Sequence, residues 1–396
     1  MCLMCDNFSR RDFLKLTALL TTGTALPLIM QQQARAADEP DAPVRVGYLP
    51  VTDAAPLLVA HARGRFDQPG KPADKPVMFR SWSQLTEAFI AGQVNVIHML
   101  APVTLWARYQ AKLPAKVVAW NHTNGSALTV LPEITDARQL SGKTVAIPFW
   151  YSIHNVIVQQ LLREAGLKAV TVTAAQGEVQ LVVMSPADMV PALVSRKISG
   201  FIVAEPFNAL AESHQVGRIL RFTGDIWKSH ACCVVMMHES DLNNRPVWSQ
   251  QVTDAIVDAQ QWIRSNRSQT ATLLSRDGPN HYTPHTAEVL TQVLQPSDTM
   301  EAGWIADHAI RHPDWHQSRI DFQPWPYDGY FSRLAELLKQ TVIEGDHSFL
   351  QNLQPQNVSA ELTDNRYVLN SIRKAGGMSA FGLADGDFQR TEVISP

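Results

Sequence analysis

The chain has 396 residues, 45% of them hydrophobic, and its formal net charge at pH 7 is -3. This weakly acidic balance argues against a protein that binds nucleic acid or an anionic membrane surface through its net charge. Of the four cysteines, two lie within the first five residues and the others are the neighbours Cys232 and Cys233, so no disulfide framework is available. Packed cores must supply the stability, and the length predicts two lobes rather than one.

Residues 1–36 have the pattern of a twin-arginine export signal. Arg10 and Arg11 precede a moderately apolar run at 16–30, and an alanine-arginine-alanine triplet at the end of the segment forms a small-x-small cleavage site. The apolar run is shorter than the ~20 residues that a spanning helix needs, which argues against a retained membrane anchor. We expect a mature chain that starts near Ala37, carries a formal charge of -5 and is periplasmic.

Short β-rich runs alternate with helical runs in two series, one before Asp136 and one after it. The predicted strands lie at 44–49, 77–80, 94–99, 144–148, 179–184 and 200–204. The predicted helices lie at 54–65, 85–91, 153–165 and 187–196, with a short one at Asp136. Such alternation is typical of parallel sheets covered by helices. From Val247 onward the pattern is almost wholly helical, and we expect this tail to return and cover the first lobe.

The first strand-to-helix junction, at residues 48–66, has the features of a ligand shelf. In a βα unit, the loop after the strand and the first helical turn expose free backbone N–H groups. Asp53 most simply caps the helix before Pro56, while Arg63 and Gly64 suit its C-terminal end. We therefore expect a binding site near the start of the mature chain.

Enzyme motifs are missing from the chain. Gly-Lys-Thr at 142–144 looks like the end of a phosphate-binding loop, but it leads into a predicted strand, and Ala137 stands where the motif needs glycine. No nucleophile elbow, zinc-protease helix or glycine-rich dinucleotide motif occurs. We expect a protein that is not an enzyme and needs no cofactor.

One candidate metal cluster consists of His230, Cys232 and Cys233. Its spacing matches no common zinc pattern, and adjacent cysteines cannot easily both point at one ion. The favoured interpretation is a buried strand at 231–237, in which the thiols act as small apolar groups. We therefore expect no metal site.

Three further residues could contact a small ligand, and each has an ordinary structural alternative. His154 opens a predicted helix, where a protonated imidazole beside free N–H groups favours an anion, or else it caps or packs that helix. Lys228 lies in a loop after a strand that ends near Phe222, and is otherwise a solvated lysine. Trp82 follows the strand at 77–80 and is otherwise a core residue.

Eight short stretches between residues 44 and 240 carry a family pattern. They are 47–50 (Gly-Tyr-Leu-Pro), 52–56 (Thr-Asp-Ala-Ala-Pro), 81–82 (Ser-Trp), 92–94 (Gly-Gln-Val), 98–102 (His-Met-Leu-Ala-Pro), 140–146 (Leu-Ser-Gly-Lys-Thr-Val-Ala), 204–207 (Ala-Glu-Pro-Phe) and 226–230 (Ile-Trp-Lys-Ser-His). In this order they resemble the solute-binding proteins of ABC transporters, in the nitrate, bicarbonate and sulfonate group. The helical tail fits that family more loosely.

The resemblance implies a periplasmic-binding-protein type II fold of the α/β class. In it, two lobes are joined by a hinge of two crossing strands, and a helical C-terminal tail follows. We expect 37–132 to form the first part of lobe 1 and 133–233 to form lobe 2. The remainder, 234–396, returns to lobe 1 and forms the tail.

The resemblance also implies where a ligand binds. The expected ligand-binding residues are Trp82, His154, Lys228, Ser126, Asp53 and Glu205. In the nitrate and bicarbonate branch, the residues that match Trp82, His154 and Lys228 approach the anion. That branch has a glutamine where this chain has Ser126, and the shorter side chain would enlarge the site or leave one hydrogen bond to water.

These implications make the chain the substrate-binding component of an ABC importer. We expect it to capture a small anion of the nitrate, nitrite, sulfonate, taurine or bicarbonate class as a monomer, and to deliver it to permease and ATPase subunits. One alternative is an exported solute sensor of the same fold. Another is an enzyme like the thiamine-pyrimidine synthases, which would need a self-modifying active site and metal-binding cysteines, whereas this chain has an export signal and a single cysteine pair.

Overall fold

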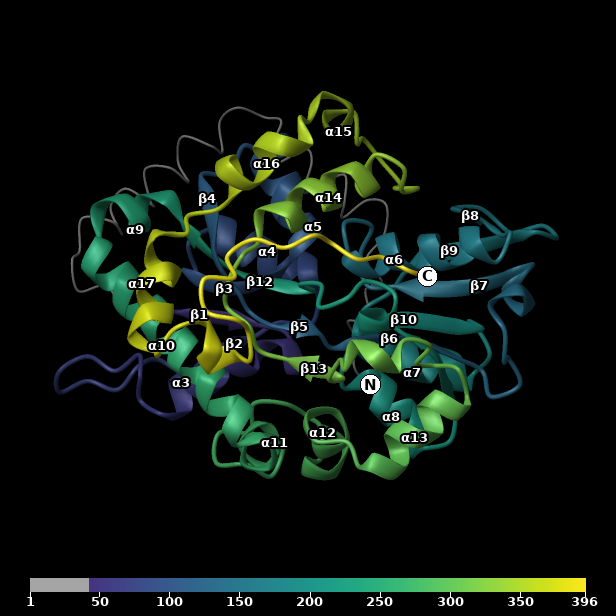
Figure 1. The fold of residues 1–396 in the computed structure, drawn as a ribbon, viewed down its shortest axis with the longest axis horizontal. Coiled ribbons are helices and arrows are strands. Elements are labelled where there is room, and N and C mark those ends of the chain that lie inside the picture. The colour runs from purple at the N-terminus through teal and green to yellow at the C-terminus, as the bar shows by residue number, and fades with distance from the viewer. Residues whose placement is uncertain (1–42) are drawn as a thin grey trace, which may run out of the picture.

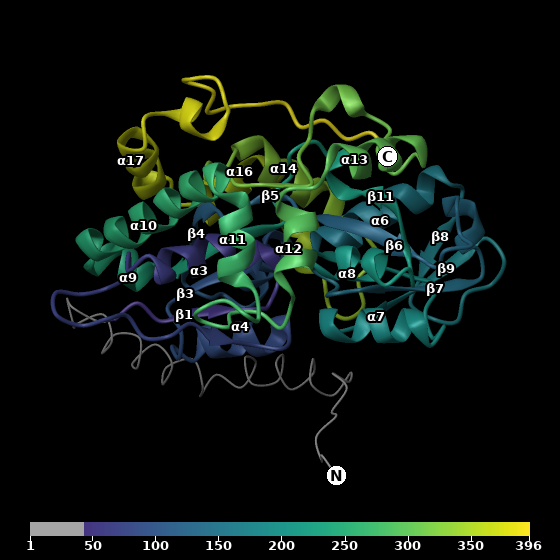
Figure 2. The same ribbon diagram turned by 90° about the horizontal axis from the view of Figure 1, so that it is seen from below.

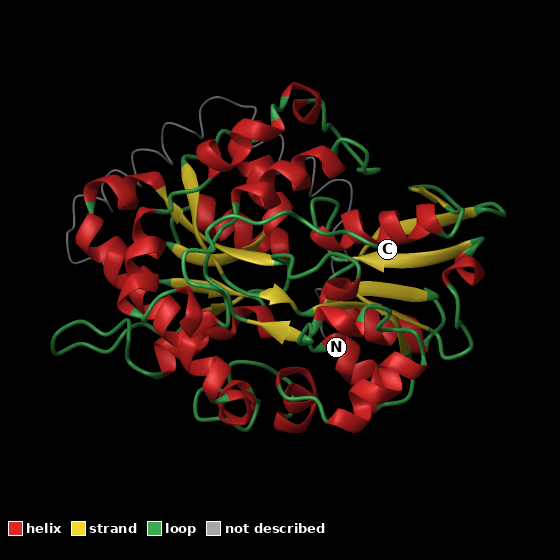
Figure 3. Ribbon diagram, viewed as in Figure 1, coloured by secondary structure: helices red, strands yellow, loops and turns green. Residues whose placement is uncertain are grey.

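The computed structural model describes residues 43–396, in which two large β-sheets lie side by side with helices packed around them (Figures 1 and 3). A third, two-stranded sheet is formed by β5 (Thr123–Asn124) and β13 (Ile320–Asp321). The predicted export signal at 1–36 lies outside the described residues. Within them, no helix is both long and apolar enough to cross a membrane.

The first sheet has the strand order β2-β1-β3-β12-β4. Its strands are β1 (Val46–Tyr48), β2 (Val77–Met78), β3 (Val96–Leu100), β4 (Ala115–Trp120) and β12 (Cys233–His238). The first three run parallel, whereas β12 is antiparallel to both β3 and β4. Every residue of β3 and β12 is buried, as expected for central strands that are covered on both faces.

The second sheet has the order β11-β6-β10-β7-β9-β8. Its strands are β6 (Ser126–Val130), β7 (Lys143–Ile147), β8 (Lys168–Val170), β9 (Glu178–Val183), β10 (Gly200–Ala204) and β11 (Arg218–Phe222). The strand predicted at 200–204 is β10, with the same bounds. The chain enters this sheet at Ser126, before the predicted boundary at 133, because β6 follows the first crossing directly and pairs antiparallel with β10 and β11.

Helices cover both sheets, and the C-terminal part of the chain is mostly helical (Figure 3). Those within the α/β series are α3 (Ala55–Ala62), α4 (Trp82–Ile90), α5 (Ala101–Leu105), α6 (Ile153–Glu164), α7 (Pro186–Val194) and α8 (Phe207–Ser213). Those of the tail are α9 (Glu239–Asn244), α10 (Pro246–Ser265), α11 (Arg267–Leu274), α12 (Ala287–Leu294), α13 (Asp298–Ala306), α14 (Asp328–Leu338), α15 (Phe349–Asn352), α16 (Pro355–Leu362) and α17 (Arg366–Lys374).

Two chain segments cross between the sheets, and they pair with each other. The first contains β5 (Thr123–Asn124) and leads from β4 to β6, while the second leads from β11 back to β12. Thr123 and Ala231 form an antiparallel bridge, and the Asn124 N–H donates to the carbonyl of His230 at 2.9 Å. The expected hinge of two crossing strands is therefore present.

The tail covers more than the first lobe. Helix α10 packs on α3 as expected, but α12 packs on α8 and α13 lies over the second lobe (Figure 2). Trp304 of α13 packs edge-on against Phe222 at 4.9 Å between ring centroids, and its Nε1 donates to Glu212 at 2.8 Å. The tail thus covers the first lobe and, beyond the expectation, also the apolar end of β11 in the second lobe. The last residues cross back to the hinge, where Ile394 bridges Trp227 (Figure 1).

Candidate ligand site between the two sheets

Buried polar side chains from both lobes meet where the chain crosses between the sheets. From the second lobe, Ser126 at the start of β6 and His154 in the first turn of α6 are both buried, and the Ser126 Oγ lies 2.9 Å from the His154 Nε2. From the hinge, the Cys232 Sγ lies 3.7 Å from that Oγ and 3.8 Å from that Nε2. Two of the predicted residues are therefore in direct contact, and a cysteine joins them.

Asp53 belongs to this buried region and does not cap a helix. A short 3-10 turn, η1 (Thr52–Ala54), precedes α3 and places Ala54 at the capping position, where no side chain supplies a cap. The Asp53 Oδ2 instead lies 3.0 Å from the His122 Nε2. The capping role is a wrong prediction, whereas the predicted end of the helix is confirmed by Gly64 with its φ of +67°.

Asp53 and His122 form a fully buried ion pair. Burial raises the pKa of Asp53 to about 6, against the lowering effect of His122. Burial alone would lower the pKa of His122, but the Asp53 carboxylate outweighs it and raises that pKa to about 10. Both groups are therefore charged at neutral pH, and their charges cancel.

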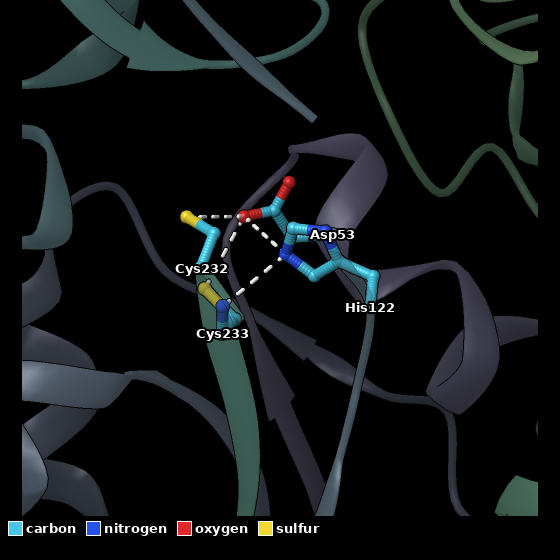
Figure 4. A group of neighbouring side chains, drawn as sticks. All are labelled: Asp53, His122, Cys232 and Cys233. Carbon is cyan, nitrogen blue, oxygen red and sulfur yellow. Dashed lines mark hydrogen bonds and ion pairs between the residues drawn. The ribbon is translucent and has the colours of Figure 1, made fainter. Parts of the chain in front are cut away.

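Both cysteines face the Asp53 carboxylate (Figure 4). The Oδ2 atom lies 3.4 Å from the Cys232 Sγ and 3.2 Å from the Cys233 Sγ. Both thiols are buried, as expected, but the expectation that neighbouring cysteines point apart is wrong. Side chains alternate only inside a strand, and Cys232 lies in a bend ahead of β12, which begins at Cys233.

The two thiols differ in acidity. Burial would raise the pKa of Cys232, but the hydrogen bond from Cys233 and the imidazoles of His154 and His122 lower it well below the ordinary value. Burial and the neighbouring Cys232 raise the pKa of Cys233 well above that value. The pair thus presents one thiolate-prone sulfur and one protonated sulfur.

Two buried N–H donors of the first lobe have no acceptor among the described residues. The Leu49 N–H donates to the His98 Nε2 at 3.0 Å, so the ring proton of this histidine lies on Nδ1. Burial lowers the pKa of His98 to about 3, so the ring is neutral. Neither that Nδ1 nor the Nε1 of Trp82, whose ring centroid is 5.3 Å away, has a hydrogen-bond partner.

The other two predicted residues lie in different surroundings. The Glu205 carboxylate is buried and accepts from the Arg319 Nε at 2.7 Å and from the Ala209 N–H at 3.1 Å. The Lys228 Nζ lies 5.7 Å from the ring centroid of Trp315 and forms no ion pair with any residue in 43–396. The structure therefore groups Asp53, Ser126 and His154 around the cysteines but leaves Lys228 and the Glu205 carboxylate outside that group.

Comparison of the sequence with known families identifies the family to which the chain belongs. Residues 37–275, more than half of the chain, match the NMT1-like family. The chain belongs to the NMT1-like family. Among curated relatives, it is 26% identical over 267 residues to the nitrate/nitrite binding protein NrtA of Nostoc sp. strain PCC 7120, an alignment that covers 61% of this chain and 59% of that protein. The chain thus spans little more than half the length of this relative.

Solved structures similar to this NMT1-like chain include periplasmic binding proteins. The nitrate-binding protein NrtA from Synechocystis PCC 6803 has a TM-score of 0.71 and 17% identity, covering 89% of this chain and 93% of that one. The aliphatic sulphonate binding protein SsuA from Escherichia coli has a TM-score of 0.53 and 17% identity, covering 82% and 90%. These likenesses show the two-lobed binding-protein fold.

Sequence reasoning missed two buried histidines of this NMT1-like protein. His98 lies in the middle of β3 and within a matched stretch but has no predicted role, and His122 is absent from the predicted site. The signal was available for His122, because it stands in the polar run 121–124 directly after the apolar strand β4. Polar residues that follow a buried strand lie at the sheet edge where ligands of open α/β sheets bind.

Proposed function

We propose that this NMT1-like protein is the periplasmic solute-binding component of an ABC importer. It captures a small anion of the nitrate, nitrite, bicarbonate, taurine or sulfonate class between its two sheets and delivers it to a membrane permease. The names of the relatives support the transport class, since they are nitrate/nitrite binding proteins and nitrate or bicarbonate import ATP-binding proteins. The proposed action is binding without chemical change.

The observation that carries the proposal is the pair of unpaired donors in the first lobe. The Trp82 Nε1–H and the His98 Nδ1–H are buried and lack an acceptor in the described chain. A buried donor without an acceptor costs roughly 1–3 kcal/mol, which a bound ligand with acceptor oxygens would remove. Nitrate, bicarbonate and sulfonates all present such oxygens, and a small cation presents none.

The second lobe and the hinge supply the remaining contacts in the proposal. The His154 Nδ1 is buried without a partner in the described chain and lies in the first turn of α6, where helix N–H groups favour an anion. Lys228 remains the proposed source of positive charge, since no described carboxylate neutralises it. Ser126 takes less space than the glutamine of the nitrate and bicarbonate branch, so we expect sulfonates to bind better than nitrate.

Calorimetry with nitrate, nitrite, bicarbonate, taurine and alkanesulfonates tests this function. Trp82→Phe keeps an aromatic ring but removes the N–H, so affinity for the best ligand should fall about 10- to 150-fold, the equivalent of 1.5–3 kcal/mol. Lys228→Ala should cause a loss of the same order. The matched control is Trp248→Phe, which removes a buried, unpartnered indole N–H from α10, outside the cluster. Equal affinities of Trp82→Phe and wild type for the best ligand would show that the site is misplaced.

The proposal also includes export of the protein to the periplasm by the twin-arginine pathway. Replacing Arg10 and Arg11 by lysine should leave the precursor in the cytoplasm, because that pathway recognises the arginine pair. Fractionation of cells followed by immunoblotting measures the outcome. Undiminished delivery of the mature protein to the periplasm would rule this route out.

A further inference from the structure

Four side chains where the first lobe meets the hinge have the chemistry of metal ligands. They are Asp53, His122, Cys232 and Cys233, all buried, and each offers one ligand atom. These four atoms lie within 4.8 Å of one another (Figure 4). We propose that this group binds a thiophilic divalent cation, and that Zn²⁺ is the ion whose coordination it fits.

The spacing of the ligand atoms supports a tetrahedral site. In such a site, bonds of about 2.0 Å to nitrogen or oxygen and 2.3 Å to sulfur keep neighbouring ligand atoms about 3.2–3.8 Å apart. The Asp53 Oδ2 lies 3.0 Å from the His122 Nε2, 3.4 Å from the Cys232 Sγ and 3.2 Å from the Cys233 Sγ. The three distances from Asp53 are within a few tenths of an ångström of this range, and the other pairs, all within 4.8 Å, need to close by at most about 1 Å to surround one ion.

The ligands come from three separate segments that are already fixed around the site. Asp53 lies on η1 after β1, and His122 lies between β4 and β5. Cys232 directly precedes β12, which begins at Cys233. The Asn121 N–H donates to the Cys233 carbonyl at 3.1 Å, which ties two of these segments together. A preformed site of this kind loses little chain entropy when it takes an ion.

Buried polar atoms at the same place lack protein partners. The Asp53 Oδ1 and the His122 Nδ1 are inaccessible to solvent and have no hydrogen-bond partner within residues 43–396. The Asp53 carboxylate is removed from water and needs strong partners to compensate. Because thiols are weak donors, the His122 imidazole is its one strong side-chain partner among the described residues. A divalent cation compensates a buried carboxylate and thiolates more fully than one imidazolium does.

Surrounding groups suit an ion with thiolate ligands. The Cys232 sulfur also lies within 3.7 Å of the Ser126 Oγ and 3.8 Å of the His154 Nε2, both from the second lobe. Such outer partners orient a ligating thiolate and stabilise its charge. An ion bound here would connect the hinge and the first lobe, through Cys232, to the second lobe. This cation site goes beyond the proposed anion binding and does not depend on it.

Zinc binding by the reduced, chelator-treated full chain tests the proposal in the absence of any anion ligand. Native mass spectrometry should show one Zn²⁺ per chain. The paired substitution Cys232→Ser with Cys233→Ser, and separately Asp53→Asn, should each lower affinity by at least the roughly 10- to 100-fold that loss of an outer partner alone costs. His238→Gln is the control, because it removes a buried histidine at the opposite end of β12 and should leave zinc affinity unchanged.

Cobalt supplies a readout that does not depend on stability. Co²⁺ bound to the wild-type chain should show the near-ultraviolet thiolate-to-cobalt charge-transfer absorption, and this band should vanish in the double cysteine variant. Circular dichroism identifies a variant that fails to fold, in which case Asp53→Asn provides the comparison. The proposal is overturned if the wild type binds zinc no better than the variants, if the cobalt complex lacks the band, or if intact mass shows that Cys232 and Cys233 form a disulfide in the isolated protein.

Discussion

Two buried imidazoles of this protein, His122 and His285, have opposite charge states at pH 7. His122 is held in its charged form by the Asp53 carboxylate. His285 has no such partner: its Nε2 lies 3.1 Å from the carbonyl oxygen of Pro50, and its ring packs edge-on against Phe207 at 5.2 Å. Burial lowers the pKa of His285 to about 4 despite the bond to Pro50, so this ring is neutral in the folded protein at pH 7.

The neutral state of His285 predicts a stability that falls as the pH falls. Between pH 6.5 and 4 the unfolded chain takes up a proton at this position and the folded chain does not, so protonation favours unfolding. The contribution of the neutral His285 to the free energy of unfolding is complete above pH 6.5, and about 3 kcal/mol of it is lost at pH 4. Urea unfolding at pH 7 and pH 4 should therefore show a difference about 3 kcal/mol smaller in His285→Gln than in wild type. Identical pH dependence of the two proteins would contradict this assignment.

At the scale of single elements, helix α6 places His154 in the buried region where the two lobes meet. The Ser152 side chain holds its first turn, since its Oγ accepts from the Asn155 N–H at 3.0 Å and donates to the Phe149 carbonyl at 2.7 Å. Helix α4 begins in the same way at Ser81, whose Oγ accepts from the Gln84 N–H at the longer distance of 3.3 Å. In both helices, a serine side chain thus caps the N-terminal turn.

Removal of the α6 cap should lower stability measurably. Ser152→Ala leaves the Asn155 N–H without an acceptor in a buried turn, so the free energy of unfolding should fall by ~1 kcal/mol, within the usual 0.5–2 kcal/mol for a lost cap. Ser81→Ala is the comparison, and we expect a smaller loss because its bond is longer and more exposed. Urea denaturation at pH 7 measures both. An unchanged stability of Ser152→Ala would mean that the cap does not hold α6.

The alternating elements could be predicted from the sequence because their signals are local. The strand at 200–204 and the helix that begins at Ile153 are apolar or amphipathic runs with clear ends, and both begin where expected. The strands β4 and β6 were not predicted, although they determine where the chain crosses between the lobes. Their pairing partners are distant in sequence, so no local pattern reveals the pairing.

The site was predicted only in part, for the same reason. Ser126 and His154 were found through resemblance and do meet, at 2.9 Å. The role of Asp53 was misjudged because a capping position looks the same in sequence whether or not a 3-10 turn precedes the helix. The role of His122 depends on the side-by-side packing of β4 and β12. This packing brings the Cys233 N–H to 3.3 Å from the His122 Nε2, although the two residues are 111 positions apart in sequence.

At the scale of the whole molecule, polar contacts join the lobes at several places. The hinge segments pair at Thr123 and Ala231. Between the lobes, the N–H and hydroxyl of Thr52 both donate to the Glu205 carbonyl, at 2.9 and 3.1 Å. The tail also contacts the second lobe at the Val342 carbonyl, which accepts from the side chain of Gln159 at 3.0 Å. We expect such links to part when a solute enters and to form again when its acceptor oxygens satisfy the buried donors.

Native mass spectrometry of the protein purified without added ligand tests solute binding most directly. The account predicts that each chain carries one small anion, or binds one when nitrate, nitrite, bicarbonate, taurine and alkanesulfonates are added. Denaturation should release this anion chemically unchanged. Trp82→Phe should retain less of it under the same conditions. A folded wild-type protein that binds none of the anions at saturating concentration, or that releases a product of altered mass, would contradict the claim that this NMT1-like protein captures a small anion between its lobes.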